Sequence, residues 1–126
     1  MTENRDGINR DEQKEQSEKL VAKLVGAIDA HPDKVQNYYD LGALLTRLNS
    51  HEQAEELFMK ALGIFAKDTK AVNLLSYGLG NLYYEVGKYE EAIKYYNKIN
   101  DDKLKADAYL MMAQSLMQMK DYKRAI

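Results

Sequence analysis

The stretch NLYYEVGKYEEAIKYYNKI, residues 81–99, is the part of this chain of 126 residues from which its architecture follows most directly. It holds two adjacent pairs of tyrosines, Tyr83 with Tyr84 and Tyr95 with Tyr96, and Gly87 stands between the pairs. Neighbouring residues of a helix point about 100° apart, so the two rings of a pair cannot share one buried stripe. One ring of each pair is therefore expected to face something other than the core.

The composition of the whole chain is that of a single soluble helical domain. Hydrophobic residues make up 45% and charged residues 30%, and one proline with seven glycines disfavours a turn-rich β fold. Eighteen basic against twenty acidic residues leave a net charge of -2, which provides no strong field for nucleic acid or an anionic membrane. The absence of cysteine excludes disulfides, thiol catalysis and thiolate metal sites.

The N-terminal segment points to a cytoplasmic protein. Residues 1–19 mix acidic and basic side chains and hold Ile8 as their only large aliphatic residue, so they lack the apolar region of a secretory signal. Residues 1–10 are polar without helical periodicity and are expected to form a disordered arm. The longest apolar run, residues 108–113, is far shorter than the roughly 20 residues that cross a bilayer, so no membrane segment is expected.

Apolar periodicity and helix-ending residues predict a series of helices. The predicted helices cover residues 12–30, two segments starting near 34 and 51, and residues 69–86, 89–99 and 103–119. They end at Pro32, at Asn49, at Gly87 and at a turn over residues 100–102. The pairs Asp33 with Gln36 and Ser50 with Gln53 predict capping boxes at the second and third helices, and Asp68 precedes the fourth.

The chain repeats itself. A shift of 38 residues carries six small or apolar positions onto six others. The first set is Leu41, Gly42, Leu45, Ala54, Phe58 and Ala61, and the second is Leu79, Gly80, Tyr83, Ala92, Tyr96 and Ile99. A further shift of 33 residues leads to Met112, Ala113, Leu116, Tyr122, Ala125 and Ile126. These shifts divide a single domain, residues 11–126, into a half unit 12–34, units 35–72 and 73–105, and a truncated unit 106–126.

Two departures from the repeat carry structural expectations. Ser76 stands where the other units have Tyr38 and Tyr109, so the middle unit lacks an aromatic residue there. Residues 69–72 are extra at the junction of two units. Because four residues make about one helical turn, they are expected to lengthen a helix while nearly keeping its phase.

The repeated pattern resembles the tetratricopeptide repeat. It is carried by Tyr38, Leu41, Gly42, Leu45, Ala54, Phe58 and Ala61, and again by Leu79, Gly80, Tyr83, Gly87, Tyr89, Ala92 and Tyr96. The resemblance spans residues 20–126. It implies an all-α fold, a right-handed α-solenoid of antiparallel helix hairpins with about six helices plus a truncated last one.

Glycines inside the predicted helices suggest how the units pack. Gly42 and Gly80 stand where glycine costs about 0.8–1.0 kcal/mol relative to alanine. We expect them to permit a close approach of helices, with Ala54 and Ala92 opposite and Phe58 wedged between successive hairpins.

The resemblance also implies a concave groove lined by the first helix of each pair. It assigns Tyr83 and Tyr96 to the core, Tyr84 to the groove and Tyr95 to the outer surface. The implied peptide-binding residues are Tyr39, Arg47, Tyr77, Asn81, Tyr84, Gln114 and Met117, beside Ala43, Thr46, Glu85, Leu110 and Gln118.

Such a lining suits recognition of a protein or peptide segment by a scaffold or adaptor. Tyrosine offers a large rigid ring, and Asn and Gln can hydrogen-bond a peptide backbone. The positions at which some members of the family hold a terminal carboxylate with Lys, Asn and Arg are different here, so no preference for an acidic C-terminus is expected.

Two alternatives stay open. In the first, the groove tyrosines only cover the groove or pack against further helices. In the second, the chain self-associates as a homo-oligomer through the uncapped face of the helix predicted over residues 103–119.

The sequence holds no constellation for catalysis, metal binding or a cofactor. His31 and His51 are the only histidines, and Glu55 stands where a metalloprotease motif requires a second histidine. The paired acids Asp101 and Asp102 lie at a helix start, where carboxylates cap. The protein is therefore expected not to be an enzyme and to need no cofactor.

Overall fold

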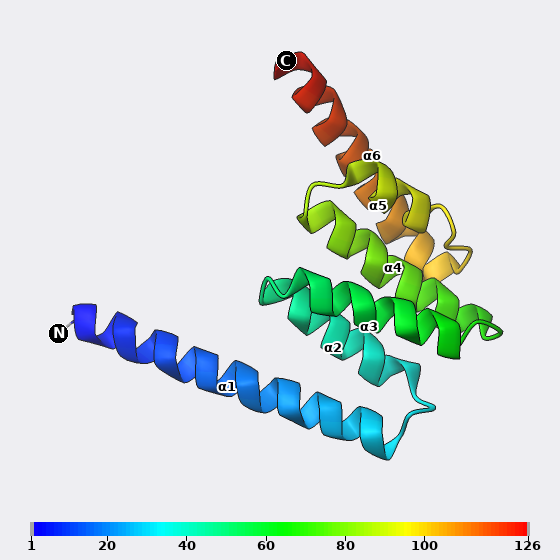
Figure 1. Ribbon diagram of the computed structural model, residues 1–126. Coiled ribbons are helices and arrows are strands. Elements are labelled where there is room, and N and C mark those ends of the chain that lie inside the picture. Colours follow the sequence, from blue (N-terminus) through cyan, green and yellow to red (C-terminus); the bar gives the residue numbers. More distant parts are fainter. Residues whose placement is uncertain (1, 126) are drawn as a thin grey trace.

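The chain is a stack of helices. The structure, a computed structural model, describes the backbone of residues 2–125 and the side chains of residues 10–120. The described backbone contains six helices and no strand (Figure 1). The helices are α1 Thr2–Ala30, α2 Val35–Arg47, α3 His51–Ile64, α4 Thr69–Glu85, α5 Tyr89–Tyr96 and α6 Asp102–Ala125. The all-α prediction is confirmed for this part of the chain.

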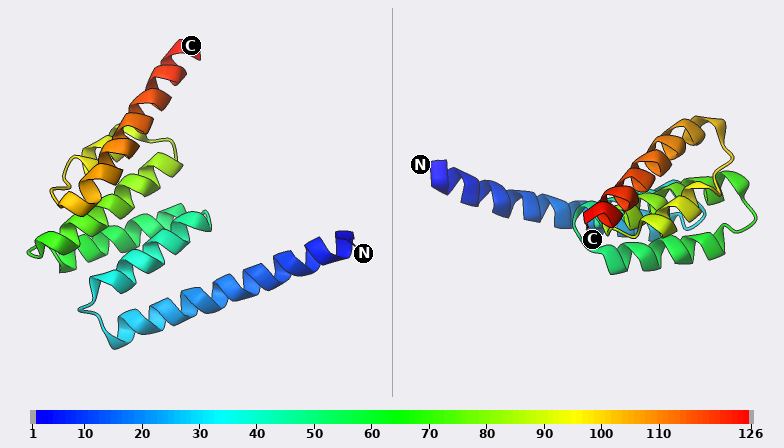
Figure 2. Two further views of the ribbon diagram at one scale, coloured as in Figure 1. Left: turned by 180° about the vertical axis from the view of Figure 1, so that it is seen from behind. Right: turned by 90° about the horizontal axis from the view of Figure 1, so that it is seen from above.

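Successive helices lie side by side in sequence order. α2 with α3 and α4 with α5 form two antiparallel hairpins, and α6 continues the stack beyond α5 (Figures 1 and 2). α2 also contacts α4, and α4 contacts α6, so the first helix of each unit lies beside that of the next. α1 contacts α2 and diverges from it toward the N-terminus (Figure 2). This arrangement is the helical solenoid expected from the repeats.

Equivalent turns join the helices of the two hairpins. Asn49 and Gly87 have φ of 63° and 81°, the left-handed region in which a helix commonly ends. The N–H group that follows each of them donates to the carbonyl five residues earlier, at 2.9 and 2.8 Å. This is the Schellman arrangement, which satisfies the last carbonyls of the helix. Both predicted turns are therefore confirmed.

The third unit has no such turn. One repeat after Gly87 stands Lys120, and α6 runs through this position as one helix of 24 residues. The predicted helix end near Met119 and the separate truncated helix are thus wrong. A lysine side chain is strained in the left-handed conformation that glycine adopts freely, so the helix continues. The side chains of Tyr122, Ala125 and Ile126, which the repeat matched, lie outside the described residues.

The start of α1 also differs from the prediction. The helix begins at Thr2 rather than near Glu12, so residues 2–10 are helical instead of forming a disordered arm. Extending an existing helix fixes one residue for each new hydrogen bond, whereas starting one fixes several for the first bond. The packed part of α1 therefore nucleates a helix that the weak periodicity of residues 2–10 does not reveal.

The predicted capping boxes are absent at α2 and α3, which have no side-chain cap. α2 starts one residue too late for Asp33, and Lys34 takes the N-cap position. Ser50 is the N-cap of α3, but its ψ of 61° comes from the preceding turn and is not the extended conformation that a capping side chain needs. Asp68, with ψ of 103°, does cap α4, accepting from Ala71 N at 3.2 Å.

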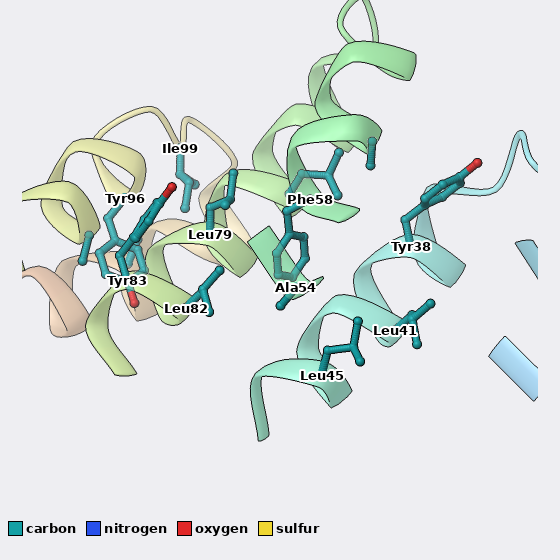
Figure 3. Packing of buried hydrophobic residues seen from close by; sticks show 14 residues of the cluster. Tyr38, Leu41, Leu45, Ala54, Phe58, Leu79, Leu82, Tyr83, Tyr96 and Ile99 are labelled. Carbon is teal, nitrogen blue, oxygen red and sulfur yellow. The ribbon is translucent and has the colours of Figure 1, made fainter. Parts of the chain in front are cut away.

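Phe58 is the wedge between the two hairpins. Its side chain is 0% exposed and lies in the middle of the apolar cluster (Figure 3). The ring contacts Gly42 of α2 and Gly78 of α4, and a Cβ added at Gly78 would lie 2.6 Å from it. Gly80 relates to Tyr96 in the same way, at 2.5 Å. The predicted close approach is confirmed, but the groups nearest these glycines are aromatic rings rather than the alanines.

The four-residue insertion lengthens α4 as expected, to 17 residues against 13 in α2. The longer helix brings the buried Asn73 to the α5–α6 connection. There its Nδ2 donates to Asn100 Oδ1 at 2.9 Å, and its Oδ1 accepts from Asn100 N at 3.1 Å. The beginning of α4 is thereby tied to the turn that leads into α6.

Ser76 is a buried hydroxyl without a partner among the described residues. It is 1% exposed, and its Oγ makes no hydrogen bond. Replacing Ser76 by alanine removes this unpaired group and raises helix propensity, so we expect the free energy of unfolding to rise by about 1 kcal/mol. Urea denaturation measures it. Ser115→Ala is the control, because Ser115 is equally buried but donates to Met111 O at 2.8 Å, and its loss is expected not to stabilise. A destabilised Ser76→Ala would contradict the assignment.

Candidate functional site

A hollow of about 550 Å³ opens on the face formed by α2 and α4. Its lining includes eight residues of the predicted groove: Tyr39, Ala43, Thr46, Arg47, Tyr77, Asn81, Tyr84 and Glu85. Asn49, Gly78 and Met111 complete the lining. Five of the seven predicted peptide-binding residues thus lie together, namely Tyr39, Arg47, Tyr77, Asn81 and Tyr84.

Tyr39 and Tyr77 are equivalent residues of successive units, and each leans on the aromatic wedge of its own unit. The ring centroid of Tyr39 lies 6.3 Å from that of Phe58, with an interplanar angle of 54°. Tyr77 lies 6.1 Å from Tyr96, at 57°. The repeat therefore reproduces a geometry as well as a residue type. Both rings are half-buried, so packing holds them in place while part of each faces the hollow.

The adjacent tyrosines divide between core and surface as the resemblance implied. Tyr83 and Tyr96 are buried, whereas Tyr84 and Tyr95 are half-buried. Tyr84 lines the hollow, and its ring meets the edge of Tyr89 with centroids 5.5 Å apart. Tyr95 does not line the hollow and instead stacks on Tyr83 at 5.5 Å.

Asn81 is oriented by a hydroxyl from beneath the hollow. Tyr96 OH donates to Asn81 Oδ1 at 2.5 Å, which leaves the Asn81 NH2 group for another acceptor. Thr46 contributes no such donor, because its Oγ1 donates to Gly42 O at 2.9 Å within its own helix. The amide of Asn81 is thus a fixed donor among the tyrosines.

The charges and hydroxyls of the hollow are balanced and neutral. Arg47 and Glu85 are equivalent, exposed residues near the C-terminal ends of α2 and α4, and their formal charges cancel. Burial raises the pKa of Tyr96 well above its ordinary value of 10.0, and the neighbouring Tyr77 adds to the shift. Burial and Tyr77 likewise raise the pKa of Tyr39. These phenols stay protonated near neutral pH.

Gln114 and Met117, the two predicted binding residues on α6, do not line the hollow. The residues with which α6 is most buried recur at helical spacing: Ala108, Met111, Met112 and Ser115. This stripe turns Gln114 and Met117 to an adjacent face, and Met117 is 63% exposed. Met111 lines the hollow instead. It stands 33 residues after Gly78, another lining residue, so the repeat itself carried the signal that identifies it.

The histidines lie apart from the hollow. His31 is exposed before α2, and His51 begins α3. Among the described residues no group of three or more His, Cys, Asp or Glu side chains is placed to hold a metal ion. No helix within the described part of the chain is long and apolar enough to cross a membrane.

Known protein families match the chain at its helical hairpins. Models of one family, the tetratricopeptide repeat, match residues 35–68, 75–99 and 106–126. These segments correspond to α2 with α3, to α4 with α5, and to α6. Comparison with curated proteins gives no match. Because the matched segments cover more than half of the sequence and coincide with the stacked helices, the chain belongs to the tetratricopeptide repeat family.

Proposed function

We propose that the hollow between α2 and α4 binds an extended peptide segment of a partner protein, so that the chain acts as a scaffold or adaptor. Tetratricopeptide repeats indicate a protein–protein interaction module in general. The observation that carries the narrower proposal is the gathering of Tyr39, Tyr77 and Tyr84 around Asn81 in one open hollow.

The physical case rests on prior order. Tyr39 and Tyr77 are already held against buried rings, so a ligand that contacts them loses little side-chain entropy from the protein. The Asn81 amide is oriented by Tyr96 and can donate to a peptide carbonyl without rearrangement. Aromatic area with one central fixed donor is the composition expected of a recognition surface.

Replacing Tyr84 by alanine is expected to weaken capture of peptides from a random decapeptide library by roughly tenfold or more. The reason is loss of a half-buried aromatic wall of the hollow. Binding is measured by fluorescence polarisation of the captured peptides, and circular dichroism checks that helix content is unchanged. Tyr84 is preferable to Asn81, because removing Asn81 would leave the Tyr96 hydroxyl unpaired.

Tyr109→Ala is the matched control. Tyr109 lies on α6 outside the hollow and is 59% exposed, so its removal is expected to leave binding unchanged. Equal binding by the Tyr84→Ala variant and the unchanged protein would refute the proposal.

A second candidate function, self-association, is favoured by the outer face of α6. Four large apolar side chains there are 57–63% exposed: Tyr109, Leu110, Leu116 and Met117. The residues equivalent to Leu116 in the preceding units, Leu45 and Tyr83, are buried. Contiguous apolar surface of this kind is typical of protein contact sites.

If α6 mediates self-association, the apparent mass in light scattering should rise with concentration and return to that of a monomer in Leu116→Glu. A charge in the middle of the apolar face would have to be desolvated in the contact, which is unfavourable. Lys105→Glu, a charge change on the same helix, is the control. A monomer at every concentration would exclude this candidate.

A cytoplasmic location and the lack of nucleic-acid or membrane partners are also proposals. They rest on the net charge of -2 and on the polar N-terminal residues.

A further inference from the structure

We infer that the hollow takes a proline-rich segment in the polyproline II conformation, an inference that rests on the proposed peptide-binding function. Three observations on the lining residues favour this class of ligand over a helix or a β-strand. They are the spacing of the equivalent tyrosines, the excess of hydrogen-bond donors, and the absence of net charge.

The spacing of the tyrosines matches the pitch of such a segment. Tyr39 and Tyr77 occupy equivalent places on α2 and α4, which contact each other. Packed helices have axes about 8–10 Å apart, so these two rings form ridges separated by about that distance. A polyproline II segment has three residues per turn and rises about 3.1 Å per residue, which gives about 9 Å per turn. A segment lying across the helices can therefore set one residue of each successive turn on each ridge.

The donors of the hollow outnumber its acceptors. Hydroxyls elsewhere on the same helices are engaged: Tyr38, Tyr83 and Tyr96 donate to Pro32 O, Glu55 Oε2 and Asn81 Oδ1. The hydroxyls of Tyr39, Tyr77 and Tyr84 donate to no described residue. None of these three is a buried orphan, since among the described side chains only Ser76 is one. With the Asn81 amide they leave four donor groups facing solvent or a ligand.

Proline supplies the complementary chemistry. Each proline presents a carbonyl acceptor and no N–H donor, so a proline-rich segment satisfies donors without requiring acceptors. A helical ligand already pairs its own backbone carbonyls and would leave these donors unpaired. An extended strand brings one N–H group for every carbonyl, and the only carboxylate of the lining is Glu85. The ligand most consistent with this inventory has carbonyls in excess.

The remaining features fit the same ligand. Arg47 and Glu85 cancel in charge, so the hollow gives no reason for a strongly acidic or basic segment. A proline segment is already extended before it binds and therefore loses little conformational entropy. Rings with neighbouring donors form the general arrangement by which proline-rich segments are recognised.

The test is isothermal titration calorimetry with two blocked peptides, acetylated and amidated to remove terminal charge. The first is decaproline, and the second is a peptide of equal length made of alternating glycine and serine. Decaproline is expected to bind about tenfold or more tightly than the glycine–serine peptide. Tyr77→Ala should weaken decaproline binding about tenfold, and Tyr77→Phe, which keeps the ring and loses the donor, by a smaller factor. Tyr109→Ala should have no effect, because Tyr109 lies outside the hollow.

Equal affinity for the two peptides, no binding of decaproline, or an equal effect of Tyr109→Ala would overturn the inference. The random decapeptide library separates this failure from failure of the proposed function. If library peptides depend on Tyr84 but are not displaced by decaproline, the hollow binds peptides of another class and only this inference falls. If no captured peptide depends on Tyr84, both fall.

Discussion

Phe58→Ala is expected to lower the free energy of unfolding by about 3–5 kcal/mol, the usual cost of truncating a fully buried phenylalanine. The ring is 0% exposed and is held between Gly42 of one unit and Gly78 of the next, so it contributes to both hairpins and to their junction. The backbone on either side cannot easily collapse onto the space, because both helices are fixed by other buried residues. Urea denaturation followed by circular dichroism measures the loss.

Phe65→Ala serves as the control for Phe58→Ala. Phe65 is half-buried beside Tyr38, with ring centroids 5.5 Å apart, so its removal is expected to cost clearly less. A second comparison tests the wedge itself. Gly78→Ala should destabilise the unchanged protein, since its Cβ would meet the Phe58 ring, but stabilise the Phe58→Ala variant by filling space. Additive effects of the two changes would contradict the wedge.

Alkaline pH is expected to reduce the free energy of unfolding by about 3 kcal/mol between pH 10 and 11.5 through Tyr83 and Tyr96. Burial raises the pKa of both phenols well above the ordinary value of 10.0, and for Tyr83 the hydrogen bond to the Glu55 carboxylate adds to the shift. Below pH 10 both phenols are protonated in the folded and unfolded chain, so their stabilisation is fully present. Above pH 10 the unfolded chain releases these protons while the folded chain holds them, so stability falls as pH rises.

Comparison with Tyr96→Phe separates this effect from titration of the lysines. At pH 8 the variant should be less stable by about 1 kcal/mol, because it loses the hydrogen bond to Asn81 Oδ1. At pH 11.5 the gap should close or reverse, because phenylalanine has no proton to lose in the unfolded state. Urea denaturation at both pH values measures the gap. A constant gap would show that Tyr96 does not titrate differently in the folded chain.

The sequence was most informative where a residue type is forced by geometry. Gly87 predicted a turn because a left-handed residue there favours glycine, and the turn occurs. The glycines at positions 42 and 80 predicted close contact, and aromatic rings fill it. The central helices of the hollow followed from the same repeats. Each of these predictions depended on backbone or steric limits that hold in any context.

The predictions that failed depended on context that no single segment contains. Ser50 has the right residue type for a cap, but the turn before it fixes its backbone in another conformation. Repeat arithmetic placed Gln114 and Met117 in the groove, whereas the packed stripe through Met111 sets the rotation of α6. Lys120 lacks the glycine that ended the earlier helices, which was visible in the sequence but was outweighed by the match of the residues that follow it.

The amide pair of Asn73 and Asn100 has a consequence for the width of the hollow. It fixes the turn from which α6 starts to the beginning of α4, the helix that supplies Tyr77, Asn81 and Tyr84. The tilt of α6, and with it the position of Met111 at the rim, is therefore governed from the end of α4 opposite Glu85. A substitution at Asn73, which touches nothing in the hollow, would act on the aperture through which a ligand enters.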